Sequence, residues 1–218
     1  MQTHNSRLLL VEGKDDEHVV KQICNVHNLD VSWTIEPAKG HDGGEGVEYL
    51  LTQVPVRLKA SGIERLGVLI DADENAQSRW ESLRDKLWNA GYKEVPRNPS
   101  PSGTIVDLSD DFGTKRFGVW IMPNNKLPGM IEDFLAFLVP ADDMLMPQVD
   151  QFLAGIPPSP QRFMDIHLPK ARIHSYLAVQ RDPGKPLGLA VTYGYLDAKR
   201  ETVSPFLKWL RGVFVSDT

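Results

Sequence analysis

The sequence predicts an α/β protein, with a mostly parallel sheet flanked by helices and a helical extension towards its C-terminal end. Two short apolar runs carry this prediction: residues 8–11 lead into Glu12, and residues 67–70 lead into Asp71. An uninterrupted apolar run is typical of a parallel strand that is buried on both faces. Around these runs the chain alternates helical and strand-like periodicity, which is the pattern of consecutive strand and helix units.

Several elements are marked by residues that start or stop them. Acidic side chains at residues 15–17 suit the positive end of a helix, which we expect to run to about Leu29. Asn75 is a favoured N-cap, and the helix after it should end near Ala90, just before Gly91. We further expect helices at residues 47–58 and 128–135, strands at residues 31–35, 104–108 and 116–122, and a glycine-rich loop at residues 39–46.

The chain changes character near residue 140. Beyond it, strand patterns fade, prolines cluster, and amphipathic helices are expected at about residues 168–179 and 204–214. We therefore predict an α/β domain at residues 1–140 and a helical extension, residues 141–218, that packs on it.

Composition limits the class of protein. The chain has 218 residues, of which 41% are hydrophobic, so it can bury a sizeable core. It has no apolar stretch of membrane-spanning length and no signal peptide at its start, which predicts a cytoplasmic protein without a membrane partner. The single cysteine, Cys24, excludes an internal disulfide and a cysteine-based zinc site, and its apolar helical setting predicts a buried thiol.

The charge balance bears on partners. The net charge is −5, which argues against a protein that holds nucleic acid by bulk positive charge. A nucleic-acid partner would need a local basic patch, or metal ions that cover the carboxylates. The sequence leaves the oligomeric state open, including a homo-oligomer.

The acids that follow the two apolar runs are the candidate active site. Because parallel strands end at one edge of a sheet, where α/β proteins place ligands, we expect Glu12, Asp71 and Asp73 to lie together. In an extended segment Asp71 and Asp73 point the same way and are close enough to share one hard cation, Mg²⁺ or alternatively Mn²⁺. Crowded carboxylates also repel, so one of them should resist ionisation. The competing interpretation is that each acid caps a helix or solvates a strand end.

These residues resemble a known family. Residues 10–16, Leu-Val-Glu-Gly-Lys-Asp-Asp, resemble the first toprim motif, and residues 70–73, Ile-Asp-Ala-Asp, resemble its Asp-x-Asp motif. The resemblance covers about residues 7–140. Segments 120–124 and 129–135 are also similar to a small group of stand-alone toprim-like proteins related to overcoming-lysogenization-defect nucleases. The resemblance implies a compact α/β sheet, with Glu12 as general acid/base and Asp71 and Asp73 as Mg²⁺ ligands.

Two functions follow from this pattern. The first is Mg²⁺-dependent phosphodiester chemistry on nucleic acid, in the manner of toprim nucleases: a metal stabilises charge on the phosphodiester while Glu12 moves a proton. The second is a toprim-like binding or regulatory module without catalysis. The sequence does not decide whether the chain is an enzyme.

Further acids near residue 130 are candidate ligands. Glu132 is a candidate third metal ligand, and Asp133 is an alternative, since both begin a predicted helix whose dipole acids stabilise in any case. Asp16 either supplies negative charge at a helix start or contacts a residue of the site without contacting the ligand itself.

Basic residues supply the candidate phosphate contacts. Lys14 follows the first strand, and Lys170 and Arg172 share a predicted helix with His174. An acidic active site repels a polyanion, so we expect Lys14, Lys170 and Arg172 to border the site and contact phosphate or nucleic acid. The competing interpretation is an ordinary solvated surface.

Overall fold

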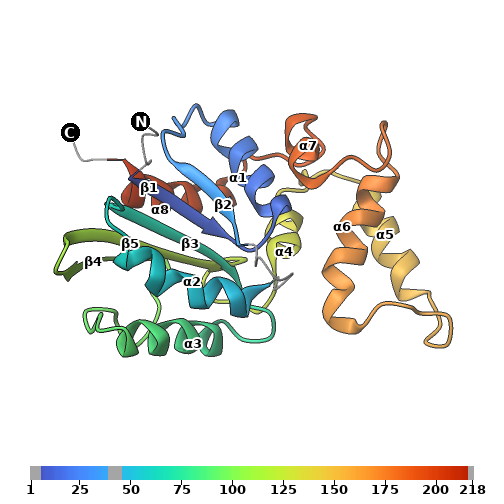
Figure 1. The fold of residues 1–218 in the computed structure, drawn as a ribbon. Helices are drawn as coiled ribbons and strands as arrows, with labels where there is room; N and C mark the ends of the chain where they lie inside the picture. The colour runs from blue at the N-terminus through green and yellow to red at the C-terminus, as the bar shows by residue number, and fades with distance from the viewer. Residues whose placement is uncertain (1–5, 39–45, 216–218) are drawn as a thin grey trace.

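The computed structural model describes residues 6–38 and 46–215, which form an α/β fold around one five-stranded sheet (Figure 1). The strands are β1 (Arg7–Val11), β2 (Thr34–Pro37), β3 (Arg65–Asp71), β4 (Thr104–Asp110) and β5 (Gly113–Met122). Their order is β2-β1-β3-β5-β4, and all neighbours are parallel except β4 and β5. The predicted mostly parallel sheet flanked by helices is confirmed.

Eight α-helices and two short 3₁₀ turns are seen in the described residues. They are α1 (Lys14–Val26), α2 (Val47–Lys59), α3 (Ala76–Asn89), α4 (Ile131–Ala136), α5 (Leu145–Ala154), η1 (Asp165–His167), α6 (Leu168–Ala178), α7 (Leu187–Thr192), η2 (Glu201–Val203) and α8 (Ser204–Phe214). No helix among them has the length and apolar character needed to cross a membrane.

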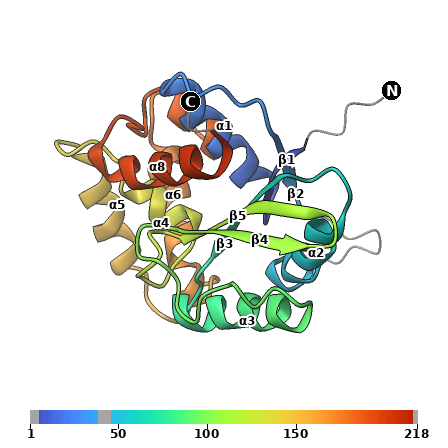
Figure 2. The ribbon, with the colours of Figure 1, turned by 90° about the vertical axis from the view of Figure 1, so that its left-hand side faces the viewer.

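The two faces of the sheet are covered by different helices. Alternate strand residues point to opposite faces, so Leu8 and Leu10 of β1 join the core beneath α2 and α3. Leu9 and Val11 join the other core, which α1, α8 and parts of α4, α6 and α7 complete. Figure 2 shows α2 and α3 on one side of the sheet and α1 and α8 on the other.

Helix α8 lies unusually close to the sheet because two glycines make room for it. A Cβ atom at Gly67 of β3 would lie 2.8 Å from the Phe214 ring, and one at Gly118 of β5 would lie 2.2 Å from Val213 Cγ2. The strand positions that lack a side chain therefore fix where α8 packs.

Three arginines cap the same helix. Arg7, Arg65 and Arg116 lie side by side in register on β1, β3 and β5. Their guanidinium groups donate hydrogen bonds to the carbonyls of the last turn of α8, at 3.1, 2.7 and 3.4 Å respectively. Cations suit the negative end of a helix dipole, so these arginines serve the fold at the edge of the sheet opposite the carboxyl ends of β1 and β3.

The structure corrects several predicted boundaries. The strand expected at residues 31–35 is wrong in position, since β2 begins only at Thr34, after α1 has ended at Val26 and the chain has turned through Asn28 at a φ of 48°. The short helices α5 and α7 were not predicted. Other predictions hold: Asn75 caps α3 through a 2.9 Å hydrogen bond from the Ser78 N–H, and Cys24 is buried. The predicted glycine-rich loop lies outside the described residues, except for Gly46.

The segment after residue 140 is helical in the described residues, but its helices pack against different parts of the molecule. Helix α8 packs on β3, β4 and β5, and α7 packs on α1, while α5 and α6 pack on each other and project from the side of the molecule (Figure 1). The predicted division at residue 140 stays a prediction.

Candidate active site at the carboxyl edge of the sheet

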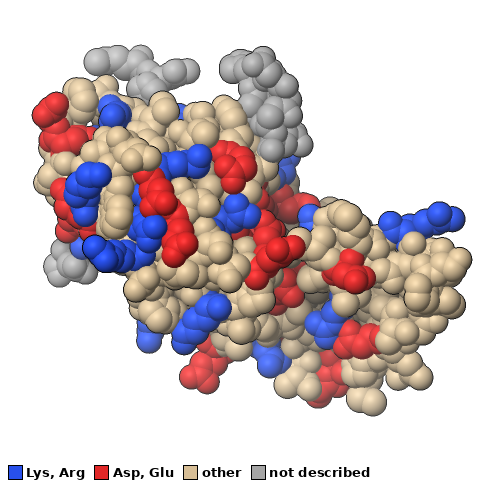
Figure 3. All heavy atoms as spheres, turned by 90° about the horizontal axis from the view of Figure 1, so that it is seen from below, with Lys and Arg blue, Asp and Glu red and all other residues tan. Residues whose placement is uncertain are grey.

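A cavity of about 570 Å³ lies at the carboxyl ends of β1, β2 and β3. Glu12 comes directly after β1, Asp71 is the last residue of β3, and Glu132 lies in the first turn of α4; all three line the cavity. Asp16 of α1 and Lys170 of α6 line it too. Figure 3 shows acidic side chains gathered where the α/β part meets the projecting helices. The prediction that Glu12 and Asp71 share one edge of the sheet is confirmed.

Glu12 and Asp71 are directly linked. The backbone N–H of Asp71 donates a 2.8 Å hydrogen bond to Glu12 Oε1, which ties the end of β3 to the residue after β1. Burial raises the pKa of Glu12 above its ordinary value of 4.5; that hydrogen bond opposes the rise, and the charge of Asp73 adds to it. Glu12 therefore holds a proton to higher pH than an ordinary glutamate does.

Asp71 and Glu132 each have a buried oxygen without a partner. Asp71 Oδ1 and Glu132 Oε2 accept no hydrogen bond from any described residue. Burial raises the pKa of Asp71 well above its ordinary value, and the charges of Glu12, Asp16 and Glu132 raise it further. Burial also raises the pKa of Glu132, against the opposing charges of Lys170 and His174. Buried acceptors without donors are rare, and here they mark a place that suits a cation or a proton.

Asp73 lies in a different setting. The expected extended segment is wrong at this residue, because Asp73 has a φ of 51° and pairs with Gly129 through two backbone hydrogen bonds of 2.9 and 2.7 Å. Its carboxylate forms an ion pair with Arg79 and lines a neighbouring cavity of about 410 Å³. Across the described residues, no three acidic, histidine or cysteine side chains are already arranged to hold one metal ion.

Asp16 and Asp133 cap the two helices that begin at this edge. The Asp16 carboxylate accepts a 2.9 Å hydrogen bond from Gly13 N–H at the start of α1, and Asp133 accepts one of 2.8 Å from Met130 N–H at the start of α4. Burial, followed by the charge of Glu12, raises the pKa of Asp16 to about 7. Of the acid pair at residues 132 and 133, Glu132 is therefore the one that faces the cavity.

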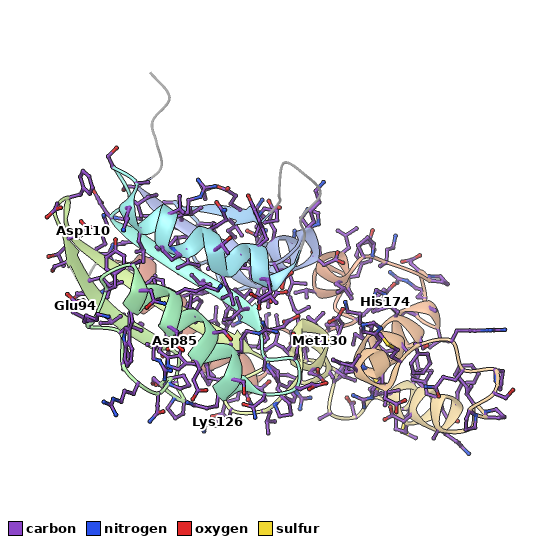
Figure 4. The ribbon with its side chains drawn as sticks, turned by 60° about the horizontal axis from the view of Figure 1, so that its bottom comes forward. Asp85, Glu94, Asp110, Lys126, Met130 and His174 are labelled. Carbon is purple, nitrogen blue, oxygen red and sulfur yellow. The ribbon has the colours of Figure 1, made fainter. Side chains whose placement is uncertain are left out.

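The predicted basic residues are only partly brought together. Lys14 and Lys170 line the cavity, and Lys170 lies close enough to lower the pKa values of Glu12 and Glu132 by its charge. Arg172 does not reach it: its guanidinium donates two hydrogen bonds, of 2.5 and 2.9 Å, to Asp150 of α5. His174, an exposed residue of α6, is not among the residues that line the cavity, although its charge lowers the pKa of Glu132 (Figure 4).

One protein family matches this chain, and the match covers the whole described fold. The family described as Protein of unknown function (DUF3226) matches residues 6–215, from the start of β1 to the end of α8. The chain belongs to this family. No curated protein and no solved structure matches it.

Arg79 supports the candidate site of this chain, and the sequence did not single it out. From the second turn of α3 it donates a 3.0 Å hydrogen bond from Nε to the Asp71 carbonyl while its Nη2 binds the Asp73 carboxylate. Arg79 Nη1 also lies 3.7 Å from Glu48 Oε1. One guanidinium thus braces the whole Asp71 to Asp73 segment. The only signal in the sequence is an arginine one turn beyond the Asn75 cap, which is too common to single out.

Proposed function

We propose that this DUF3226 chain is a toprim-like protein that performs Mg²⁺-dependent phosphodiester chemistry on nucleic acid in the Glu12, Asp71 and Glu132 cavity. The observation that carries the proposal is a pair of buried carboxylate oxygens, Asp71 Oδ1 and Glu132 Oε2, that belong to residues lining this cavity and have no hydrogen-bond partner in the described part of the chain. The toprim resemblance gains support from Glu12 and Asp71, which follow or end neighbouring parallel strands and are hydrogen-bonded to each other.

The donor set fits a hard divalent cation. Mg²⁺ prefers oxygen ligands, keeps several waters and needs only one or two protein carboxylates, and Mn²⁺ accepts the same kind of ligand. Asp71 and Glu132, which both line the cavity, would hold the ion. When bound, the ion would offset the negative charge that develops on the phosphate during reaction.

The protein's own residues have separate tasks in this proposal. Glu12 exchanges a proton with the attacking water or the leaving oxygen, a role that suits a carboxyl whose raised pKa lies nearer to neutral pH. Lys170 contacts the phosphate from α6, and Lys14 does so from the start of α1. Asp16 holds the first turn of α1, so that Glu12 and Lys14 stay at the cavity wall.

One observation favours a second function. The Asp73 carboxylate is already neutralised by Arg79, so one acid of the Asp-x-Asp motif is engaged within the protein. A binding or regulatory module that uses the same cavity without catalysis would need only the remaining acids and lysines to recognise its ligand.

Cleavage assays separate the two functions. Plasmid and single-stranded DNA are incubated with the wild type, Glu12→Gln and Asp71→Asn, with Mg²⁺, Mn²⁺ or EDTA. We expect metal-dependent cleavage of at least one of the two DNAs, and we expect it to fall by about 100-fold or more in either variant. Asp85→Asn is the control, since Asp85 is an exposed acid on α3 away from the site (Figure 4). Binding without cleavage would favour the second function, and neither binding nor cleavage would contradict both.

A further inference from the structure

The described residues that line the cavity carry few positive charges. Among them are five acids and only two cations, Lys14 and Lys170. Both lysines are exposed, and neither is engaged in an ion pair with another described residue. Two free ammonium groups beside a set of acids suit one phosphate group better than a row of phosphates.

Two arginines on helices that border the site, Arg79 of α3 and Arg172 of α6, are already engaged within the protein. Arg172 is held by both oxygens of Asp150, and Arg79 is held by Asp73 and the Asp71 carbonyl. A guanidinium with such partners would have to lose them before it could contact a phosphate. These two arginines are therefore bound to partners within the protein and do not add free positive charge to the site.

A continuous nucleic-acid backbone needs more positive charge than two lysines supply. Each strand of a duplex carries one negative charge about every 3.4 Å, and proteins that hold it neutralise several phosphates in a row. A polyanion that crossed this edge would meet more carboxylates than lysines. The cavity volume of about 570 Å³ falls instead within the range of sites for small molecules.

We infer that the cavity receives the terminal phosphate of a nucleic-acid strand, held by Lys170 and Lys14, and not the interior of a continuous strand or duplex. This inference rests on the proposed function and names its substrate class. The buried oxygens of Asp71 and Glu132 supply the second observation, because they provide the acceptor sites for the cation that must accompany an anionic group in so acidic a cavity.

A binding measurement with and without strand ends tests the inference. An internally labelled DNA oligonucleotide, phosphorylated at both ends, is compared by fluorescence anisotropy in Mg²⁺ with the same sequence ligated into a circle. We expect the circle to bind at least about tenfold more weakly, and Lys170→Ala to weaken the linear probe by about tenfold. Lys126→Ala is the matched control, an exposed lysine beyond β5 that lies apart from α6 (Figure 4). A nucleoside monophosphate as competitor shows whether a free nucleotide can replace the strand end.

The outcomes are distinct from those of the proposed function. Equal affinity for circle and linear DNA would overturn the inference, as would an absence of binding to every probe. If the circle is bound and cut in a metal-dependent way, the proposed chemistry survives and the inference fails. If the phosphorylated linear probe binds tightly but is never cut in Mg²⁺ or Mn²⁺, the inference stands and the catalytic proposal fails.

Discussion

Asp16 is a buried acid at the start of α1, and its protonation links stability to pH. Burial and the charge of Glu12 raise its pKa from 3.8 to about 7. Between about pH 4 and pH 7 the folded protein keeps a proton that the unfolded chain has lost, so stability falls as the pH rises through this window. At roughly 1.4 kcal/mol per pKa unit, the full effect above pH 7 is about 4 kcal/mol.

The variant Asp16→Asn removes this linkage. Its amide oxygen can still accept the Gly13 N–H bond, which measures 2.9 Å in the wild type. We expect the variant to gain about 2 to 4 kcal/mol in free energy of unfolding at pH 8, and to lose much of the decline between pH 4 and pH 7.

Urea denaturation in EDTA at several pH values measures this difference through tryptophan fluorescence. Asp15→Asn is the matched control, because it changes the same charge one residue earlier at an exposed position, and it should alter stability by less than about 0.5 kcal/mol. If Asp16→Asn is no more stable than the wild type at pH 8, burial and the charge of Glu12 do not raise the pKa of Asp16 as described.

Two further predictions concern packing and the brace on the site. Gly118→Ala should lose about 1 to 3 kcal/mol of stability in urea denaturation, since its Cβ would lie 2.2 Å from Val213 Cγ2; a loss below about 0.5 kcal/mol would contradict the close packing of α8. Arg79→Ala should lose about 1 to 2 kcal/mol, and a double-mutant cycle with Asp73→Asn should show a coupling of at least about 0.5 kcal/mol, whereas additive effects would show that the ion pair does not hold the segment.

The parts of the fold that the sequence predicts are those that local signals determine. The apolar runs of β1 and β3 and the Asn75 cap act within a few residues, so the predicted elements match the observed ones. Strand β2 begins later than predicted, after the turn at Asn28, and Trp33 just before it stacks on Phe214 of α8 with ring centroids 4.6 Å apart, a contact that sequence periodicity does not reveal. Helices α5 and α7 are short and depend on their neighbours.

The candidate site also contains residues that the sequence predicted correctly and residues that it did not. Glu12 and Asp71 come together because β1 and β3 are parallel neighbours. Alternating strands and helices predict that the carboxyl ends share an edge, but the pairing of β1 with β3 is known only from the structure. Asp73 and Arg172 were also expected at the cavity, but each is bound to a partner from another element: Arg79 for the first and Asp150 for the second. Such pairing depends on tertiary distances, and no spacing in the sequence reports it.

Metal-dependent stabilisation tests the central claim most directly. The melting temperatures of the wild type and Asp71→Asn are measured in EDTA and in millimolar Mg²⁺ or Mn²⁺, and each protein is compared with itself, because the substitution also removes a buried ionisable group. An ion at about 100 times its Kd stabilises the folded state by about 2.7 kcal/mol. We predict a clear metal-induced rise for the wild type and for Asp85→Asn that is lost in Asp71→Asn. A rise of the same size in Asp71→Asn, or none in the wild type, would contradict a cation site at the end of β3.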